Sequence, residues 1–231
     1  SSDLGYEIVT IGSGGYEEAI DDLVKSDNVK RLGFESEDML YSNYESLRKA
    51  LDFTELVPIK DEVTRLRRIK TPRELERIKK AESIGDKVFS EILEFIRPGV
   101  TELEVAARIE YLLKLYGGER TSFPAIVASG VNSSMPHAVP TTKKIEQGDF
   151  VTMDFGCVYE GYCSDMTRTV VVGKATDKQK EIYNLVLEAQ LAALDALKAG
   201  LKGKEVDKVA RDIIYNAGYE GCFGHGLGHS V

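Results

Sequence analysis

The chain has 231 residues, of which 42% are apolar, and a formal net charge of −8. That length and apolar content support one large domain or two small ones with a real core. An acidic protein is poorly matched to a phosphate backbone, and no apolar run is long enough to cross a bilayer, so we expect neither nucleic acid nor membrane as a partner. The start of the sequence shows no signal-peptide pattern, and three cysteines are too few for a disulfide framework. We therefore expect free thiols and a cytoplasmic location.

The first 60 residues alternate between patterns typical of strands and of helices. The expected strands lie at residues 5–11, 31–34 and 55–59, and the expected helices lie near residues 17–25 and 39–51. This order predicts a small α/β domain over residues 1–63, and its abrupt start suggests that the beginning is missing. The basic stretch that follows, residues 65–70, could be a nucleic-acid patch. In an acidic chain we interpret it instead as a solvated linker at the domain boundary.

The remaining residues, 64–231, contain four well-marked helix patterns. Helix starts are expected at residues 71–74, 101–104 and 176–179, and capping boxes mark the first and the third of them. The corresponding helices are expected to end before residue 98, at the glycines at 117 and 118, and near residue 198, and a fourth helix is expected over about 205–217. The helices come in two pairs, with apolar strand patterns between them.

These helix pairs resemble an internal repeat. A shift of 101 residues places Gly99 on Gly200 and Gly117 on Gly218, and it also matches the apolar positions between those glycines. The first unit continues from its helices into a hairpin, whereas the chain ends after the second pair. The repeat therefore predicts a second hairpin beyond residue 231.

Two apolar segments, at residues 150–158 and 162–172, predict a β-hairpin, and a further strand is expected near residues 123–128. If the turn is Tyr159-Glu160, Asp154 and Asp165 face each other directly, with Cβ atoms about 4.5–5.5 Å apart. Two carboxylates that close repel each other unless a proton or a cation joins them, and their hard oxygens suit Mn²⁺, Mg²⁺ or Zn²⁺. Because the flanking positions are apolar, we predict a metal site here rather than two solvent-facing acids.

All three histidines lie in segments flanked by glycine or proline rather than on apolar helix faces. His225 and His229 are four residues apart, but the glycines between them argue against a helical zinc motif and favour an extended loop that leaves His229 able to bind a metal. His137 lies in a loop between strands, where an imidazole could donate to an oxyanion. This distribution favours function over a purely structural role.

Five motifs together resemble the creatinase/Xaa-Pro peptidase family, whose fold is called pita-bread. They occur in the family's order between residue 64 and the end of the chain, and they read VASGVNS (127–133), PH (136–137), GDFVTMDFG (148–156), GYCSDMTRT (161–169) and GHGLGH (224–229). The resemblance implies an α+β pita-bread fold, incomplete here, preceded by part of a small α/β domain.

In that family two divalent metal ions are held by two aspartates, a histidine and two glutamates. The resemblance assigns Asp154, Asp165 and His229 to the first three positions, and the two glutamates would follow residue 231. It makes His137 a histidine near the scissile bond and His225 a histidine that lines the substrate pocket. Mn²⁺ is the first expectation for the metal, followed by Co²⁺ or Zn²⁺.

The implied activity is metal-dependent hydrolysis of the N-terminal bond of a peptide with a free N-terminus, with proline preferred in the second position. A homodimer is the expected assembly, and the 231-residue chain alone is expected to be inactive, with an incomplete metal site. Two alternatives remain: a methionine aminopeptidase, against which the leading α/β domain argues, and a pseudoenzyme of the same fold that binds a peptide or protein. A pseudoenzyme would be expected to have lost the metal aspartates, which are kept here.

Overall fold

The computed structural model describes residues 8–229, and the chain forms two compact units, residues 1–71 and 72–231. Each unit has its own hydrophobic core. The boundary therefore falls after the basic stretch that was expected to be a linker. Most of that stretch is a short helix, α3 (Glu62–Arg68), in which no residue is buried.

The first unit is a parallel two-stranded sheet with two helices, α1 (Gly15–Ser26) and α2 (Tyr41–Ala50). Its strands, β1 (Arg31–Glu35) and β2 (Glu55–Ile59), lie where the sequence predicted them. The strand expected at residues 5–11 is wrong for residues 8–11, which form no strand and are exposed. Residues 5–7 lie outside the described residues. An alternating pattern alone does not make a strand, because the backbone also needs a partner.

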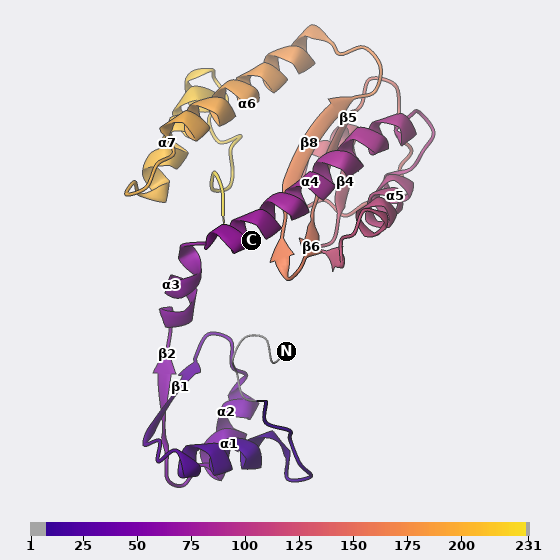
Figure 1. Ribbon diagram of the computed structural model, residues 1–231. Helices are drawn as coiled ribbons and strands as arrows, with labels where there is room; N and C mark the ends of the chain where they lie inside the picture. The colour runs from indigo at the N-terminus through magenta and orange to yellow at the C-terminus, as the bar shows by residue number, and fades with distance from the viewer. Residues whose placement is uncertain (1–7, 230–231) are drawn as a thin grey trace. The chain divides into compact units, whose positions relative to one another are not determined.

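The second unit begins with two helices that pack on a sheet (Figure 1). The helices are α4 (Pro72–Phe95) and α5 (Glu102–Leu115). The sheet is antiparallel in the order β4 (Ile126–Ser129), β5 (Phe150–Phe155), β8 (Met166–Val171). A short 3₁₀ helix, Gly130–Ser134, follows β4. A second small sheet contains β3 (Arg120–Thr121), β6 (Cys157–Tyr159) and β7 (Tyr162–Cys163).

The hairpin register differs from the one predicted. Tyr159 pairs with Tyr162, so the turn is Glu160-Gly161, and Asp154 lies opposite Thr167 rather than opposite Asp165. Both turn residues have positive φ, 45° at Glu160 and 80° at Gly161, as a two-residue type I′ turn requires. The predicted turn Tyr159-Glu160 would have required positive φ at a bulky tyrosine, which is disfavoured.

The last two helices repeat the first two at the predicted offset of 101 residues. α6 (Asp177–Ala196) ends 101 residues after α4, and α7 (Gly203–Asn216) begins and ends 101 residues after α5. The start of each second helix is also repeated: the Thr101 amide donates to Glu104, and the Lys202 amide donates to Glu205. α6 and α7 form a separate small core around Ala189, Ala193, Val206 and Ala210.

Candidate metal centre

Asp154 lies near the end of β5, half-buried between two fully buried neighbours, Met153 and Phe155. Its Oδ1 atom is buried and has no hydrogen-bond partner in the described part of the chain. A buried carboxylate oxygen without a partner is costly, and such atoms are unusual in folded proteins. A cation would supply the missing partner, so this atom fits a metal site.

Asp165 lies between β7 and β8, where the hairpin is interrupted. The opposing residue is Gly156, and a Cβ there would lie 1.8 Å from the Ser164 carbonyl oxygen. The close approach occurs where the strand pairing is interrupted, next to Asp165, whose side chain is 24% exposed. The Asp165 amide donates to Oε1 of Glu82, on α4, over 3.4 Å.

The electrostatics of the site favour a bound cation. Burial raises the pKa of Asp154, as does the neighbouring Asp165, while a hydrogen bond from Thr167 and the charge of His229 act in the opposite direction. Burial also raises the pKa of Glu82; the hydrogen bond from the Asp165 amide opposes this, and the charge of Asp165 adds to it. Burial thus disfavours the charged forms of Asp154 and Glu82, and each of these two residues neighbours Asp165. A divalent cation among them would relieve both the burial cost and the repulsion.

His229 approaches the same aspartates from the segment after α7. Its Nε2 atom lies 3.7 Å from Oδ2 of Asp165, and its side chain is 75% exposed. As the side chains stand, residues 8–229 contain no group of three or more His, Cys, Asp or Glu residues arranged around a common ion position. The three predicted ligands therefore lie in one region of the structure. Within residues 8–229, their side chains are not yet arranged around a common ion position.

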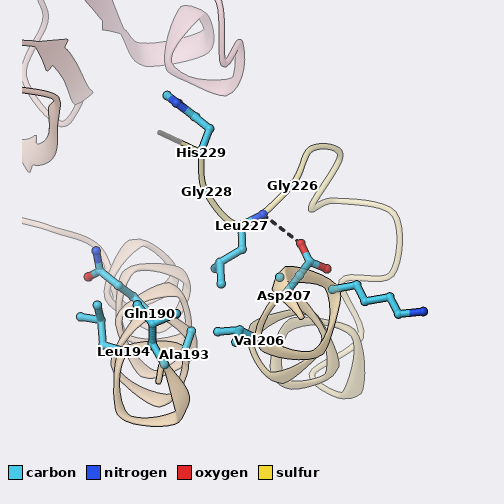
Figure 2. Close-up of a pocket in the computed structure, with 12 residues that line it drawn as sticks. Gln190, Ala193, Leu194, Val206, Asp207, Gly226, Leu227, Gly228 and His229 are labelled. Atoms are coloured by element: carbon cyan, nitrogen blue, oxygen red, sulfur yellow. Dashed lines mark hydrogen bonds between the residues drawn. The ribbon is translucent and has the colours of Figure 1, made fainter. Parts of the chain in front are cut away.

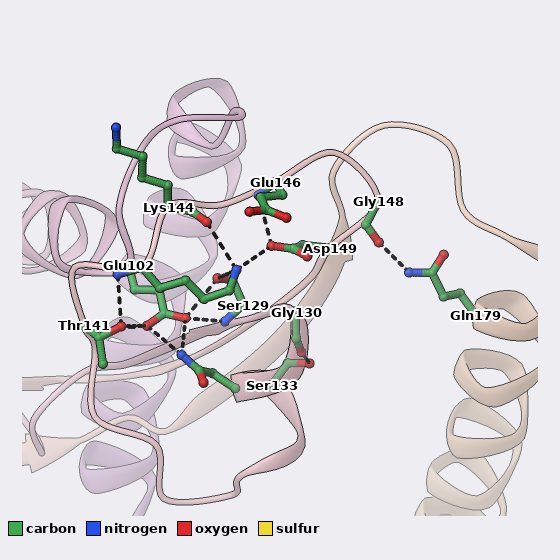
Figure 3. A network of polar contacts seen from close by, with 12 residues as sticks. Glu102, Ser129, Gly130, Ser133, Thr141, Lys144, Glu146, Gly148, Asp149 and Gln179 are labelled. Atoms are coloured by element: carbon green, nitrogen blue, oxygen red, sulfur yellow. Dashed lines mark hydrogen bonds and ion pairs between the residues drawn. The ribbon is translucent and has the colours of Figure 1, made fainter.

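His137 is exposed on the loop between β4 and β5, and a buried carboxylate holds the chain on both sides of it, at Ser129 and Thr141 (Figure 3). Glu102, at the first position of α5, is fully buried. It accepts hydrogen bonds from the Ser129 amide at 2.7 Å and from the Thr141 amide at 3.0 Å, and the hydroxyl groups of both residues add further bonds. Asn132 donates to the same carboxylate at 3.1 Å. The loop is thus anchored although its tip is exposed.

His225 is exposed in the segment that also carries His229, and its ring packs edge-on against Phe223. Leu227 points from this segment toward α6 and α7, where Leu227, Val206 and His229 are among the residues that line a pocket (Figure 2). His229 points away from that side of the segment. Within residues 8–229, neither His137 nor His225 forms a hydrogen bond or an ion pair with the two aspartates.

Sequence reasoning missed one residue of this region, Glu82. It occupies a polar position in the periodic pattern of α4, and nothing in that pattern distinguishes it from a solvent-facing glutamate. Its contact is with the amide of Asp165, 83 residues away. Only the packing of α4 against the hairpin could reveal it.

A two-helix layer covers an antiparallel sheet, and acidic side chains lie at a break in its hairpin, an arrangement that a divalent cation could use. The chain belongs to metallopeptidase family M24, whose model matches residues 76–231. The creatinase/prolidase N-terminal domain model matches residues 2–69. The expected α+β pita-bread fold is thereby confirmed, and the family implies divalent metal cofactors.

The chain is similar to several named proteins. It is 46% identical over 204 residues to a Xaa-Pro dipeptidase of Pyrococcus furiosus, a match that covers 88% of this chain and 58% of that relative. It is 44% identical over 227 residues to an uncharacterized peptidase of Bacillus subtilis, with 98% and 64% covered. Among solved structures, a Xaa-Pro dipeptidase from Bacillus anthracis matches with a TM-score of 0.94 and 47% identity, covering 98% of this chain and 63% of that one. The chain thus spans about three-fifths of the length of these relatives.

Proposed function

We propose that the protein is a metal-dependent peptidase that hydrolyses the N-terminal bond of peptides, with proline preferred in the second position. The observation that carries the proposal is the buried Oδ1 of Asp154, which has no hydrogen-bond partner among residues 8–229 and lies beside Asp165, whose carboxylate His229 approaches. Family membership and the similarity to two Xaa-Pro dipeptidases support the choice of reaction and substrate.

In this proposal Asp154, Asp165 and His229 are metal ligands. Two divalent ions are proposed, with Mn²⁺ as the first choice and Co²⁺ or Zn²⁺ as alternatives, because carboxylate and imidazole ligands accept all three. When bound, such ions lower the pKa of water and polarise a carbonyl group. The family resemblance implies two further ligands, both of them glutamates.

The other two histidines are proposed to act on the substrate. His137 would stabilise the negative charge that develops on the carbonyl oxygen, a role that suits a side chain displayed on an anchored loop. His225 would line the substrate pocket. Both side chains are exposed, as contact with a peptide requires.

The proposed partner is a peptide with a free N-terminus, and the proposed assembly is a homodimer, which rests on the family resemblance. A cytoplasmic location is proposed because the three cysteines are free thiols. Among the described residues, no helix is both long and apolar enough to cross a membrane.

The assignment of the ligands can be tested by replacing them in the protein at full family length. Asp154→Asn and His229→Ala should each lower kcat/KM for an Xaa-Pro peptide by more than about 100-fold, since even groups outside the first ligand shell typically contribute 10–100-fold. Asp195→Asn, at an exposed position of α6, is the control and should be neutral.

Metal analysis of the same preparations provides a second readout. About two divalent ions per wild-type chain are expected, with fewer in the two ligand variants. Unchanged turnover in either variant would overturn the ligand assignment. Wild-type protein that binds peptides tightly without metal would instead identify a pseudoenzyme, and cleavage confined to N-terminal methionine would identify a methionine aminopeptidase.

A further inference from the structure

An ion pair on α7 has a geometry that distinguishes it from the other charged pairs of that helix. Asp207 and Arg211 lie one turn apart and are joined by two hydrogen bonds, Nε to Oδ2 at 2.8 Å and Nη2 to Oδ1 at 3.0 Å. Their side chains are 21% and 26% exposed. A two-point arginine–carboxylate contact of this kind fixes both side chains in orientation as well as distance.

The same two side chains hold the backbone of the segment that follows α7. Arg211 donates to the carbonyl oxygens of Phe223 at 2.6 Å and His225 at 2.8 Å. Asp207 accepts from the Leu227 amide at 2.9 Å, the contact drawn in Figure 2. Three alternate residues of the segment are therefore tied to one ion pair, which we call the α7 clamp (Asp207 and Arg211).

The segment has little else to define its conformation. Residues 222–229 form no helix and no strand, and three of them, at 224, 226 and 228, are glycines. Glycine has the largest conformational freedom to lose on ordering, so such a segment requires external contacts to hold one shape. Besides the clamp, contacts come from Phe223 and Leu227, which pack on the α6–α7 core. The Phe223 ring also contacts the clamp itself, since its centre lies 4.4 Å from the guanidinium carbon of Arg211.

A second ion pair on the same helix provides an internal comparison. Lys208 and Asp212 have the same spacing of four residues and a contact of 2.7 Å, but their side chains are 70% and 50% exposed. The hydrogen bonds of Lys208 go to Asp212. The two ion pairs thus lie on the same helix with the same spacing. They differ in that the Asp207–Arg211 pair also binds the backbone of residues 222–229.

We infer that the α7 clamp is a positioning device: it fixes the backbone from which His225 and His229 project, and thereby sets the affinity of the metal centre. The inference rests on the proposed function in taking His229 as a ligand. Arginine suits the role better than lysine, because its planar guanidinium can bind a carboxylate at two points and still donate to two carbonyl groups.

In the first helix pair, a different residue anchors the loop that carries a histidine. Glu102 on α5 anchors the loop that carries His137, and α5 is the counterpart of α7 at the 101-residue offset. Glu102 corresponds to Gly203, however, and Asp207 corresponds to Ala106. In each half, the second helix therefore anchors a segment that carries histidines. The anchoring residues do not occupy equivalent positions in the two halves.

The test compares Asp207→Asn with Asp212→Asn, the same substitution on the same helix, by amide hydrogen exchange of this chain. Asp207→Asn should raise the exchange rate across residues 223–229 about tenfold or more and leave β5 and β8 as protected as they are in Asp212→Asn. Arg211→Lys, a milder change, should raise the same rates to a smaller extent. Co²⁺ titration of the full-length protein should show about 10–100-fold weaker binding in Asp207→Asn and unchanged binding in Asp212→Asn.

Equal exchange of residues 223–229 in the two aspartate variants would overturn the inference. So would a rise spread evenly over β5 and β8 in both Asp207→Asn and Arg211→Lys, because that result would indicate general stabilisation. The exchange comparison does not depend on peptidase activity. Inactive wild-type protein with the expected exchange pattern would therefore count against the proposed function and not against the clamp.

Discussion

Glu102 is a charged residue type that is rarely buried, yet its surroundings stabilise it in the interior, where it anchors the His137 loop. A fully buried glutamate is disfavoured, since burial raises its pKa and penalises the charged form. Hydrogen bonds from Thr141, Ser129 and Asn132 outweigh that penalty, and the net result is a lowered pKa. The charged carboxylate is thus stable in the interior because the donors of the His137 loop surround it.

We predict that Glu102→Gln destabilises the protein in a pH-dependent way. Because the pKa of Glu102 in the folded protein lies below its usual 4.5, its contribution is complete above pH 4.5 and is lost as the pH falls through the folded value. At neutral pH the variant should lose about 1–3 kcal/mol of unfolding free energy. The reason is that the glutamine NH₂ group is a donor, and it would face the hydrogen-bond donors that surround the Glu102 carboxylate.

Urea unfolding at several pH values checks this, with Glu110→Gln, at an exposed position of the same helix, as a control of near-zero effect. The difference between wild type and Glu102→Gln should shrink in acid. A difference that stays constant from neutral pH to below pH 4 would contradict the prediction.

At the scale of elements, the hairpin that carries both aspartates depends on a break at Gly156. There β5 passes into β6, and the backbone approaches Ser164 and the hydroxyl of Ser122 too closely for any side chain. The Ser122 hydroxyl donates to the Ser164 carbonyl at 2.7 Å, which holds the break in place. Asp165 follows directly, so the position of a proposed ligand depends on this contact.

Gly156→Ala should therefore destabilise the protein by about 1–3 kcal/mol or more, because its Cβ would meet backbone that cannot move without shifting the hairpin. Gly203→Ala is the matched control: no atom lies within 4 Å of a Cβ at that position, the first of α7. That variant should be within about 1 kcal/mol of wild type or slightly more stable. Thermal unfolding of both variants decides the matter, and equal melting temperatures would show that the close approach is not required.

At the level of the whole chain there are two compact units, and α3 is the last helix of the first one. That helix buries none of its residues and carries several basic ones, whereas the second unit has an extensive core formed by α4, α5 and the sheet. The repeat adds that α6 and α7 are built like α4 and α5 but have a much smaller core in this chain.

Limited trypsin digestion should cut first at α3, after Arg65, Arg67 or Arg68, because exposed segments without buried side chains open most easily. The expected product is a resistant fragment that begins between residues 66 and 69, identified by mass spectrometry. Arg108 and Lys143, which are partly buried in the second unit, should be cut later. An early cut at either of them would show that the second unit is not a stable unit by itself.

Features that depend on neighbours along the chain could be predicted from the amino-acid sequence. The helices begin at Thr101 and Thr176 as predicted, and both starts form capping boxes. The glycines that end the helices and the 101-residue offset also follow from local preferences for helix starts and ends. The same is true of the resemblance: the motifs around Asp154, Asp165 and His229 identified the family, while their assignment as ligands stays a proposal.

Tertiary structure decided what depends on residues far apart in the chain. The register of the hairpin followed from positive φ values at Glu160 and Gly161, so Asp154 faces Thr167 although it remains close to Asp165. Glu82, Glu102 and the α7 clamp were invisible in the sequence, because each acts through partners on another segment of the chain. A periodic pattern predicts that a polar side chain lies on a helix. Only the tertiary packing shows which distant segment of the chain that side chain binds.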